Sequence, residues 1–138
     1  MPASLHTAAC DLMGCDYPVF LAGMGGVARA DLAAAVSAAG GYGFLGMVRE
    51  PPALIRSQIH AVRAATDREF GVNLIPAATP AALLAEQIDV CLSEQVSSVC
   101  LFWDVSASLI DRLRDAGIIV VVQVGSPGEA RRAVAAGS

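Results

Sequence analysis

The chain has 138 residues, of which 55% are hydrophobic and 16% are charged, and its formal net charge is −4. This composition excludes a disordered chain, and the length suits a single domain that buries its own core. The acidic balance, without a run of basic residues, argues against a nucleic-acid partner, and no apolar run reaches the roughly 18 residues that a membrane span needs.

In chain order, residues 1–16 form an N-terminal leader that lacks the basic and apolar segments of a secretory signal. Five apolar runs follow without polar alternation, as is typical of parallel strands buried on both faces. They cover residues 17–22, 43–47, 70–75, 98–103 and 118–124. Their starts, near 18, 43, 70, 98 and 118, are separated by 25, 27, 28 and 20 residues, which predicts five successive βα units.

The segments between these runs have helical spacing. Apolar residues recur at i, i+4 and i+7, and each trio predicts a helix face that packs on a sheet. The trios are Leu32, Val36 and Ala39; Ile55, Ile59 and Val62; and Leu84, Ile88 and Cys91. Residues typical of helix ends flank the same segments. They are Gly40 and Gly117 at C-termini, Pro51-Pro52 and Pro80 at N-termini, and Ser126 with Glu129 in a capping box.

Two architectures accept this pattern. A doubly wound five-stranded sheet fits the length, whereas a (β/α)₈ barrel has the same repeat but usually needs about 250 residues. In both architectures ligands bind at the C-terminal ends of the strands, so the loops there carry the functional argument.

The loop after the first predicted strand reads Ala22-Gly23-Met24-Gly25-Gly26. It matches neither the phosphate-binding P-loop nor the G-x-G-x-x-G dinucleotide motif. Bare backbone and one thioether suit a flat aromatic ligand, because glycine lets such a ligand approach the main chain closely. The alternative is a tight turn that needs glycine only for its geometry.

The third predicted strand ends in Phe70-Gly71-Val72-Asn73-Leu74. A carboxamide is costly to bury without a partner, and it can both donate and accept hydrogen bonds. Asn73 therefore suits an imide-like ligand edge, such as the pyrimidine part of a flavin. The alternative is an Asn that bonds the backbone of its own loop.

Three other groups invite structural interpretations. Asp104, after the fourth predicted strand, is expected to cap the following helix in competition with Ser106, although a general base there is conceivable. Trp103 is expected in the core rather than against a ligand. His60 is expected on the polar face of its helix.

The four cysteines are Cys10 and Cys15, five apart, and Cys91 and Cys100, nine apart, without a C-x-x-C motif. This spacing does not predict a zinc site, and packed thiols are the expected role. We therefore expect no metal site. With no secretory signal, we expect a cytoplasmic protein without disulfides.

Three blocks resemble the nitronate monooxygenases, formerly called 2-nitropropane dioxygenases. They are PVFLAGMGGVARADLAAAVSAAGGYGFLG at 18–46, FGVNL at 70–74 and VVVQVGSPGEARRAVAAG at 120–137. The resemblance implies an FMN-dependent oxidoreductase on a TIM-type barrel. It thus overrides the length argument and predicts a partial (β/α)₈ barrel over residues 17–138, truncated to about five βα units.

The resemblance also implies site residues. The family's Ala-Pro-Met flavin contact matches Ala22, Gly23 and Met24, with glycine in place of proline. The family's flavin-contacting Asn matches Asn73, and Gln123 matches a polar position that faces the flavin. The family's catalytic histidine and its phosphate-binding loops fall beyond residue 138, so no catalytic residue is predicted within the chain.

The resemblance implies oxidation of an alkyl nitronate by O₂ as the activity. Enoyl-acyl-carrier-protein reductases that depend on FMN share the same blocks and are the first alternative. The second is a non-catalytic half-barrel that associates with another chain. An open sheet has unpaired edges, with Val19 and Leu21 on one and Val120 and Val122 on the other, so a homo-oligomer is expected.

Overall fold

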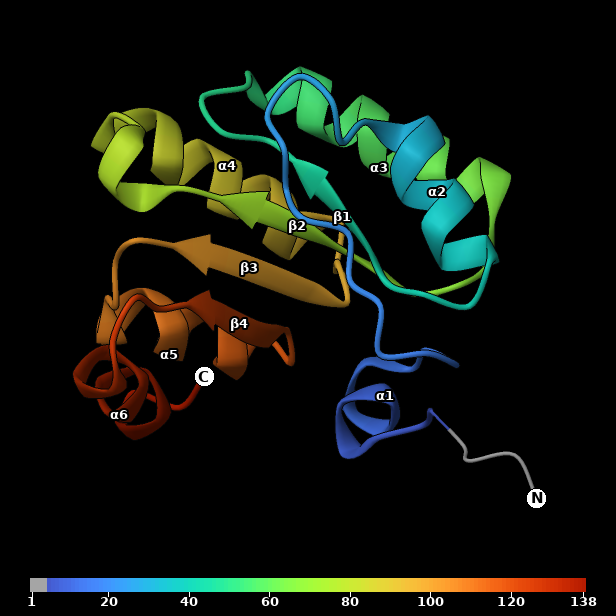
Figure 1. Cartoon of the computed structure of the whole chain (residues 1–138). Coiled ribbons are helices and arrows are strands. Elements are labelled where there is room, and N and C mark those ends of the chain that lie inside the picture. Colours follow the sequence, from blue (N-terminus) through green and yellow to red (C-terminus); the bar gives the residue numbers. More distant parts are fainter. Residues whose placement is uncertain (1–4) are drawn as a thin grey trace.

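The computed structural model describes residues 5–138, which form one layer of parallel strands with helices packed against it (Figure 1). The elements in chain order are α1 (Ala8–Met13), α2 (Ala30–Ala38), β1 (Gly43–Gly46), α3 (Pro52–Ala65), β2 (Phe70–Leu74), the 3₁₀ turn η1 (Pro76–Ala78), α4 (Ala81–Ser93), β3 (Ser98–Phe102), α5 (Ala107–Asp115), β4 (Ile119–Gln123) and α6 (Pro127–Ala135).

The four strands lie in sequential order, β1-β2-β3-β4, and every pair is parallel. A doubly wound sheet would place a later strand on the other side of the first one, so the order excludes that alternative. Sequential parallel strands with crossover helices are the wall of a barrel. The structure thus confirms the predicted barrel-type architecture.

The first predicted strand, 17–22, is wrong as a strand. It makes one isolated bridge, between Phe20 and Tyr42, in which Leu21 N donates to Tyr42 O and Tyr42 N donates to Val19 O, both over 2.9 Å. Pro18 has no N–H to extend this ladder toward the N-terminus. The segment still lies beside β1, so it occupies the edge at which a first barrel strand is expected.

Strand pairing assigns each side chain to one face of the sheet. Leu45, Val72 and Val99 share one level and are fully buried against the helices. One residue further along, Asn73 pairs with Cys100 and Cys100 with Val121, and these side chains face the opposite side. Since side chains alternate along a strand, helices cover one face and the other faces a pocket.

In helix α2 the buried face differs from the predicted one. Leu32 is exposed, and the buried side is made of small residues, Ala30, Ala33, Ala34 and Ser37. A Cβ on Gly43 would come closer than 3.0 Å to the backbone of Ala33, so the helix lies almost directly on β1. Only small side chains fit between elements this close.

The faces predicted for the next two helices are confirmed. Ile55, Ile59 and Val62 of α3 are fully buried, as are Ile88 and Cys91 of α4. Glycines with left-handed backbone end α2 and α5, at Gly40 (φ 91°) and Gly117 (φ 79°), as predicted.

At the capping box of α6, the structure has the first of the two expected hydrogen bonds. Glu129 N donates to Ser126 Oγ at 3.2 Å, but the Glu129 carboxylate accepts from Gly125 N instead of from Ser126 N.

The edge residues differ from expectation. Val19 is 61% exposed, as predicted for an open edge, but Val120 is buried and Val122 packs against the core, because both point toward the helices.

Within the leader, helix α1 packs on the strand face opposite the other helices. Cys10, Met13 and Cys15 form a cluster there with Tyr42 and Phe44. The Tyr42 hydroxyl is within 2.7 Å of Ser98 Oγ at the start of β3, and burial raises the pKa of Tyr42 to about 12. Helix α1 therefore covers the N-terminal end of this face and leaves the C-terminal end open. No helix among residues 5–138 is both long and apolar enough to cross a membrane.

Candidate functional site

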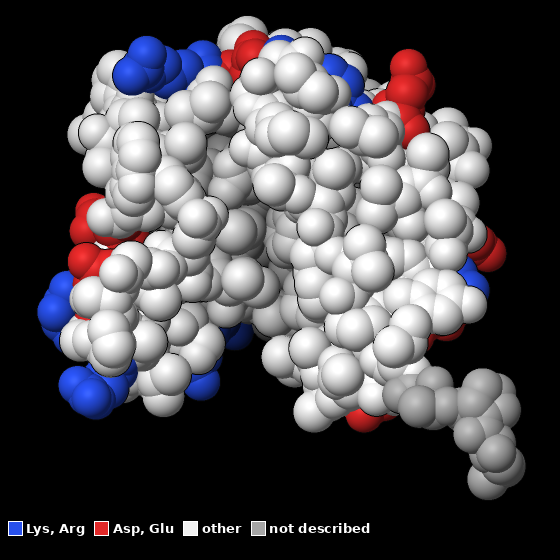
Figure 2. Space-filling model, viewed as in Figure 1, with Lys and Arg blue, Asp and Glu red and all other residues white. Residues whose placement is uncertain are grey.

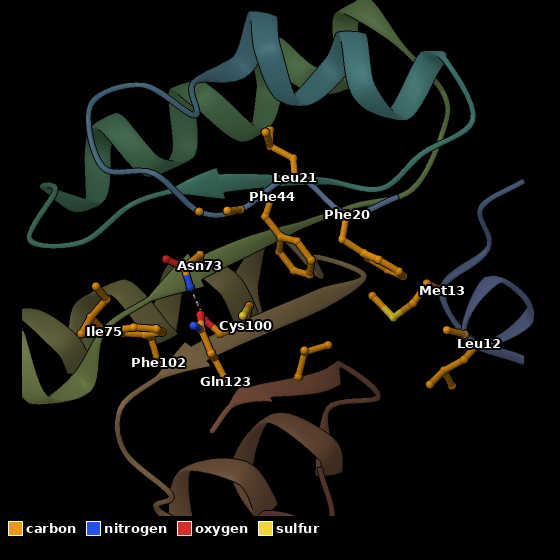
Figure 3. Close-up of a pocket in the computed structure, with 14 residues that line it drawn as sticks. Leu12, Met13, Phe20, Leu21, Phe44, Asn73, Ile75, Cys100, Phe102 and Gln123 are labelled. Carbon is orange, nitrogen blue, oxygen red and sulfur yellow. Dashed lines mark hydrogen bonds between the residues drawn. The ribbon is translucent and has the colours of Figure 1, made fainter. Parts of the chain in front are cut away.

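A pocket of about 550 Å³ lies on the inner face of the sheet (Figure 3). Its walls come from α1, the 20–23 segment and the inward-facing residues of all four strands. The lining residues are Ala9, Leu12, Met13, Phe20, Leu21, Ala22, Gly23, Phe44, Asn73, Ile75, Cys100, Phe102, Val121 and Gln123. This volume is typical of small-molecule sites, which are mostly apolar with a few polar groups.

Two predicted ligand-contacting segments meet at this pocket. A Cβ on Gly23 would come closer than 3.0 Å to Cβ, Cγ and Oδ1 of Asn73, so the Gly23 backbone rests directly on the Asn73 side chain. Any larger residue at position 23 would separate the two segments. The missing side chain therefore places main-chain groups beside a carboxamide at one edge of an apolar pocket.

Asn73 is 5% exposed and held in a fixed orientation. Its Nδ2 donates to the backbone oxygen of Cys100 on the neighbouring strand over 3.2 Å, the dashed line in Figure 3. This partner lies on β3, so the structure does not support an Asn that bonds its own loop. Among residues 5–138, no hydrogen bond to Asn73 Oδ1 is formed, which leaves that oxygen able to accept from a ligand N–H.

Gln123 ends β4 and is paired in register with Phe102, so both lie at the C-terminal rim of the pocket. Cys100 lies one level deeper, opposite Asn73, and burial raises the pKa of its thiol despite a hydrogen bond from Asn73. Phe44 and Phe102 supply flat apolar surface toward the cavity (Figure 3).

Of the five residues predicted to contact a cofactor, the structure brings four to one pocket: Ala22, Gly23, Asn73 and Gln123. Met24 does not line it. Its side chain is 41% exposed, and its backbone lies so close to β1 that a Cβ on Gly46 would come within 3.0 Å of it. The chain turns at Ala22, whose oxygen accepts from Met24 N over 2.9 Å, and this turn directs Met24 away from the cavity.

The face of the molecule around the pocket carries almost no charge, and Figure 2 shows the charged side chains at its periphery. No arginine or histidine is among the residues that line the pocket. His60 is exposed, as predicted, and its Nε2 lies 2.9 Å from Glu94 at the far side of the helices. His6 Nε2 lies 2.8 Å from Asp11.

The structure corrects the expectations for Trp103 and Asp104. Trp103 is 70% exposed with φ of 71°, and its ring lies tilted by 44° against Phe102 with 4.5 Å between centroids. Its left-handed backbone turns the indole out of the core. The first-turn N–H groups of α5 receive no side-chain cap from Asp104 or from Ser106, because the cap position is Ser106 and its hydroxyl lies near Ser108 instead.

Sequence reasoning missed the contribution of α1 to the site. Leu12 and Met13 line the pocket although they lie in the segment predicted as a leader. The one available signal was the apolar pair itself, followed by Gly14 at a helix C-terminus (φ 71°).

A sequential parallel sheet, with helices outside and an apolar pocket on its inner face, defines the chain as part of a barrel of the (β/α) class. A family model for nitronate monooxygenase matches residues 6–138. The chain belongs to the nitronate monooxygenase family, which consists of oxidoreductases.

Relatives and solved structures agree with this assignment. The chain is 33% identical over 134 residues to a dehydrogenase of Mycobacterium tuberculosis. That enzyme is named for a 5-hydroxy-7a-methyl-1-oxo-octahydro-1H-indene-4-carboxyl-CoA. The alignment covers 97% of this chain and 37% of the relative. FabK from Thermotoga maritima (M276A mutant) superimposes with a TM-score of 0.90 at 32% identity, over 96% of this chain and 44% of that one. Nitroalkane oxidase from Streptomyces ansochromogenes gives 0.81 at 28% identity, over 96% and 46%. The chain thus spans less than half the length of each.

Proposed function

We propose that the pocket holds the isoalloxazine ring of FMN and that the chain contributes this ring site to an oxidoreductase that oxidises alkyl nitronates with O₂. The observation that carries the proposal is the contact between the Gly23 backbone and the Asn73 carboxamide at the edge of an apolar pocket. Membership of the nitronate monooxygenase family supports the reaction type.

The donor set fits a flavin ring. Gly23 has no side chain between its backbone and Asn73, and Ala22 and Gly23 both line the pocket, so a flat ligand there can contact their main-chain groups. Asn73 Oδ1 is free to accept from an imide N–H, and Nδ2 is fixed by Cys100 O. Phe44 and Phe102 provide apolar surface for the ring faces.

The pocket does not fit the phosphate of FMN. A phosphate needs cations or several convergent N–H groups, and no arginine lines the pocket. We propose that residues 5–138 recognise the ring alone and that the family's phosphate contacts come from outside this part of the protein.

A flavin held at this site would supply one-electron redox chemistry between the substrate and O₂. The residues of this chain orient the ring through Asn73 and exclude water from its apolar faces. Removing the proton beside the nitro group requires a base. The side chains that line the pocket include no carboxylate and no imidazole that could act as this base. Cys100 lines the pocket, but burial raises the pKa of its thiol and keeps it protonated. We propose that the base also comes from outside residues 5–138.

A second candidate function is hydride transfer on an acyl thioester. The observation that favours it is the 33% identity to a carboxyl-CoA dehydrogenase over 97% of this chain. The enoyl-acyl-carrier-protein reductases, which share the same sequence blocks, also act on acyl thioesters. Both candidates share the flavin-ring site, so they differ in substrate and not in the role of Asn73. All four cysteines are free thiols, and we propose the cytoplasm as the compartment.

The test compares riboflavin with FMN on the 138-residue protein by quenching of flavin fluorescence. Because only the ring is recognised, both should bind with the same dissociation constant within a factor of about three, a difference of less than 1 kcal/mol. Asn73→Ala should weaken both by about fivefold, since it removes one hydrogen bond of roughly 1 kcal/mol to a buried ligand. His60→Ala, on the opposite side of the helices, is the matched control. Failure of riboflavin to bind, or equal binding by the Asn73→Ala variant, would overturn the ring-site proposal.

A further inference from the structure

Cys10 and Cys15 are brought together by the way α1 ends. Gly14 has a left-handed backbone (φ 71°), and both Gly14 N and Cys15 N donate to Cys10 O, over 2.8 and 3.1 Å. In this type of helix ending, the side chains at these two positions commonly contact each other across the turn. The backbone hydrogen bond thus brings the two cysteines together, and both belong to one cluster.

Both thiols lie in one small cluster with Met13, Tyr42 and Phe44. The two thiols lie close enough to affect each other's pKa. Cys15 Sγ also donates to Tyr17 O over 3.2 Å, and Cys10 Sγ lies 3.6 Å from Thr7 Oγ1.

The two thiols differ in acidity. Burial acts to raise the pKa of Cys10, but hydrogen bonding with Thr7, together with the neighbouring Cys15 and His6, outweighs it and holds the pKa below its ordinary value. Burial, together with the neighbouring Cys10, raises the pKa of Cys15. The pair therefore contains one thiol favoured as a thiolate and one that stays protonated beside it.

We propose that Cys10 and Cys15 are an oxidisable thiol pair that forms an intrachain disulfide with a hydroperoxide as oxidant. In the first step the Cys10 thiolate attacks the peroxide oxygen, which breaks the O–O bond and yields a sulfenic acid and water after protonation. In the second step Cys15 sulfur attacks the sulfenic sulfur, and the hydroxyl leaves as water. Two thiols and one hydrogen peroxide thus give one disulfide and two waters.

The other two cysteines provide an internal contrast. Cys91 packs in the cluster on the helix-covered face, whereas Cys100 packs on the pocket face. The sheet separates them, so they cannot pair without unfolding. Sequence spacing alone does not distinguish the two pairs.

Oxidation of this pair would act on the pocket. Helix α1 has six residues, too few to be stable without tertiary contacts, and it carries Ala9, Leu12 and Met13 of the pocket wall. Opening of such a short helix exposes the thiols to oxidant, and the disulfide then fixes the turn that holds the helix end in place. In a reducing compartment such bonds are transient and redox-sensing.

The test needs no flavin, so its result does not depend on whether the proposed function is correct. The reduced 138-residue protein is treated with hydrogen peroxide, unfolded, alkylated with iodoacetamide and digested with trypsin. The chain has no lysine, so peptide 1–29 contains Cys10 and Cys15 and peptide 69–112 contains Cys91 and Cys100. We expect peptide 1–29 to lose two hydrogen atoms and to take no alkyl group, while peptide 69–112 takes two.

Single variants check the order of the steps. In Cys15→Ser, Cys10 should be trapped by dimedone as the sulfenic acid, and peptide 1–29 should show no disulfide. Cys91→Ser is the matched control and should leave the oxidation of peptide 1–29 unchanged. Circular dichroism before oxidation verifies that each variant is folded. Two alkyl groups on peptide 1–29 of oxidised, folded wild-type protein, or dimers linked between chains in place of the internal bond, would overturn the proposal.

Discussion

Replacing Gly23 by alanine perturbs the proposed ring site at the point where its two segments touch. The added methyl would lie closer than 3.0 Å to three atoms of Asn73, whereas non-bonded carbon atoms sit about 3.5–4.0 Å apart. Asn73 cannot yield, because its strand is paired on both sides. The 20–24 segment must move instead, since it joins the sheet through the isolated Phe20–Tyr42 bridge and not through a strand ladder.

We expect two separate effects of Gly23→Ala. Overpacking should lower the free energy of unfolding by about 1–3 kcal/mol, toward the lower end because the segment can move. The displaced backbone should also lose a hydrogen bond of about 1 kcal/mol to the ring and weaken riboflavin binding by roughly fivefold. Urea denaturation and quenching of riboflavin fluorescence measure the two quantities.

Gly26→Ala is the matched control in the same segment. Its φ of 76° is left-handed, so alanine there should cost about 1 kcal/mol of stability. A Cβ at this position meets nothing within 4 Å, and Gly26 does not line the pocket. Riboflavin should therefore bind Gly26→Ala as it binds the wild-type protein. Equal weakening in both variants, or none in Gly23→Ala, would refute the reasoning from the close contact.

Three further predictions concern other groups. Iodoacetamide should alkylate Cys100 slowly near pH 8 and faster above pH 9, because the pKa of this thiol is raised. Saturating riboflavin should slow the reaction, because Cys100 lines the pocket. Mass spectrometry measures both rates, and a rate that riboflavin does not change would contradict binding of riboflavin in the pocket. Glu94→Gln should cost about 1 kcal/mol at pH 7 in urea denaturation, since it ends the ion pairs with Arg56 and Arg63. Burial alone would raise the pKa of Glu94, but His60 and Arg56 outweigh it and lower the pKa. The stabilisation therefore exists above the unfolded-state pKa and is lost as the pH falls through the folded-state pKa, and a deficit of the variant that persists in acid would count against this. Gln87→Met should lower the free energy of unfolding by about 1–2 kcal/mol, because Gln87 Nε2 donates to the backbone oxygens of Met47 (3.2 Å) and Glu50 (2.8 Å). An unchanged free energy in urea denaturation would contradict this and show that the unpartnered Oε1 offsets both bonds.

Much of the fold was accessible from the sequence because buried parallel strands read as apolar runs. Strands β1 to β4 each lie within one residue of a predicted run at either end. The run at 17–22 misled for a local reason: it has the composition of a strand, but Pro18 and the turn after Ala22 limit its pairing to one bridge. Pairing depends on both neighbours, and composition does not report it.

Helix faces were predictable only where large side chains marked them. In α3 the spacing of Ile55, Ile59 and Val62 gave the correct buried face. In α2 the exposed Leu32 suggested the wrong one, because close contact with Gly43 selects small residues for the buried side. Periodicity weighs hydrophobicity, whereas the distance between helix and strand decides which size fits.

The site was predicted in part. Ala22, Gly23, Asn73 and Gln123 were chosen by family resemblance, and the structure places all four on one pocket. Their roles as flavin contacts stay predictions. The exposed position of Trp103 was not predictable, since its left-handed backbone sets the direction of the indole.

The most direct test of the account is the methyl spectrum of the protein labelled at methionine with ¹³C, recorded during titration with riboflavin. Met13 lines the pocket, whereas Met47 is fully buried in the cluster on the helix-covered face. If the ring binds on the inner face of the sheet, the Met13 methyl resonance should shift with riboflavin and the Met47 resonance should not. Met24 lies outside the pocket lining and should shift less than Met13. An unchanged Met13 resonance at saturating riboflavin, or a larger shift at Met47, would contradict a flavin-ring site on the inner face of this sheet.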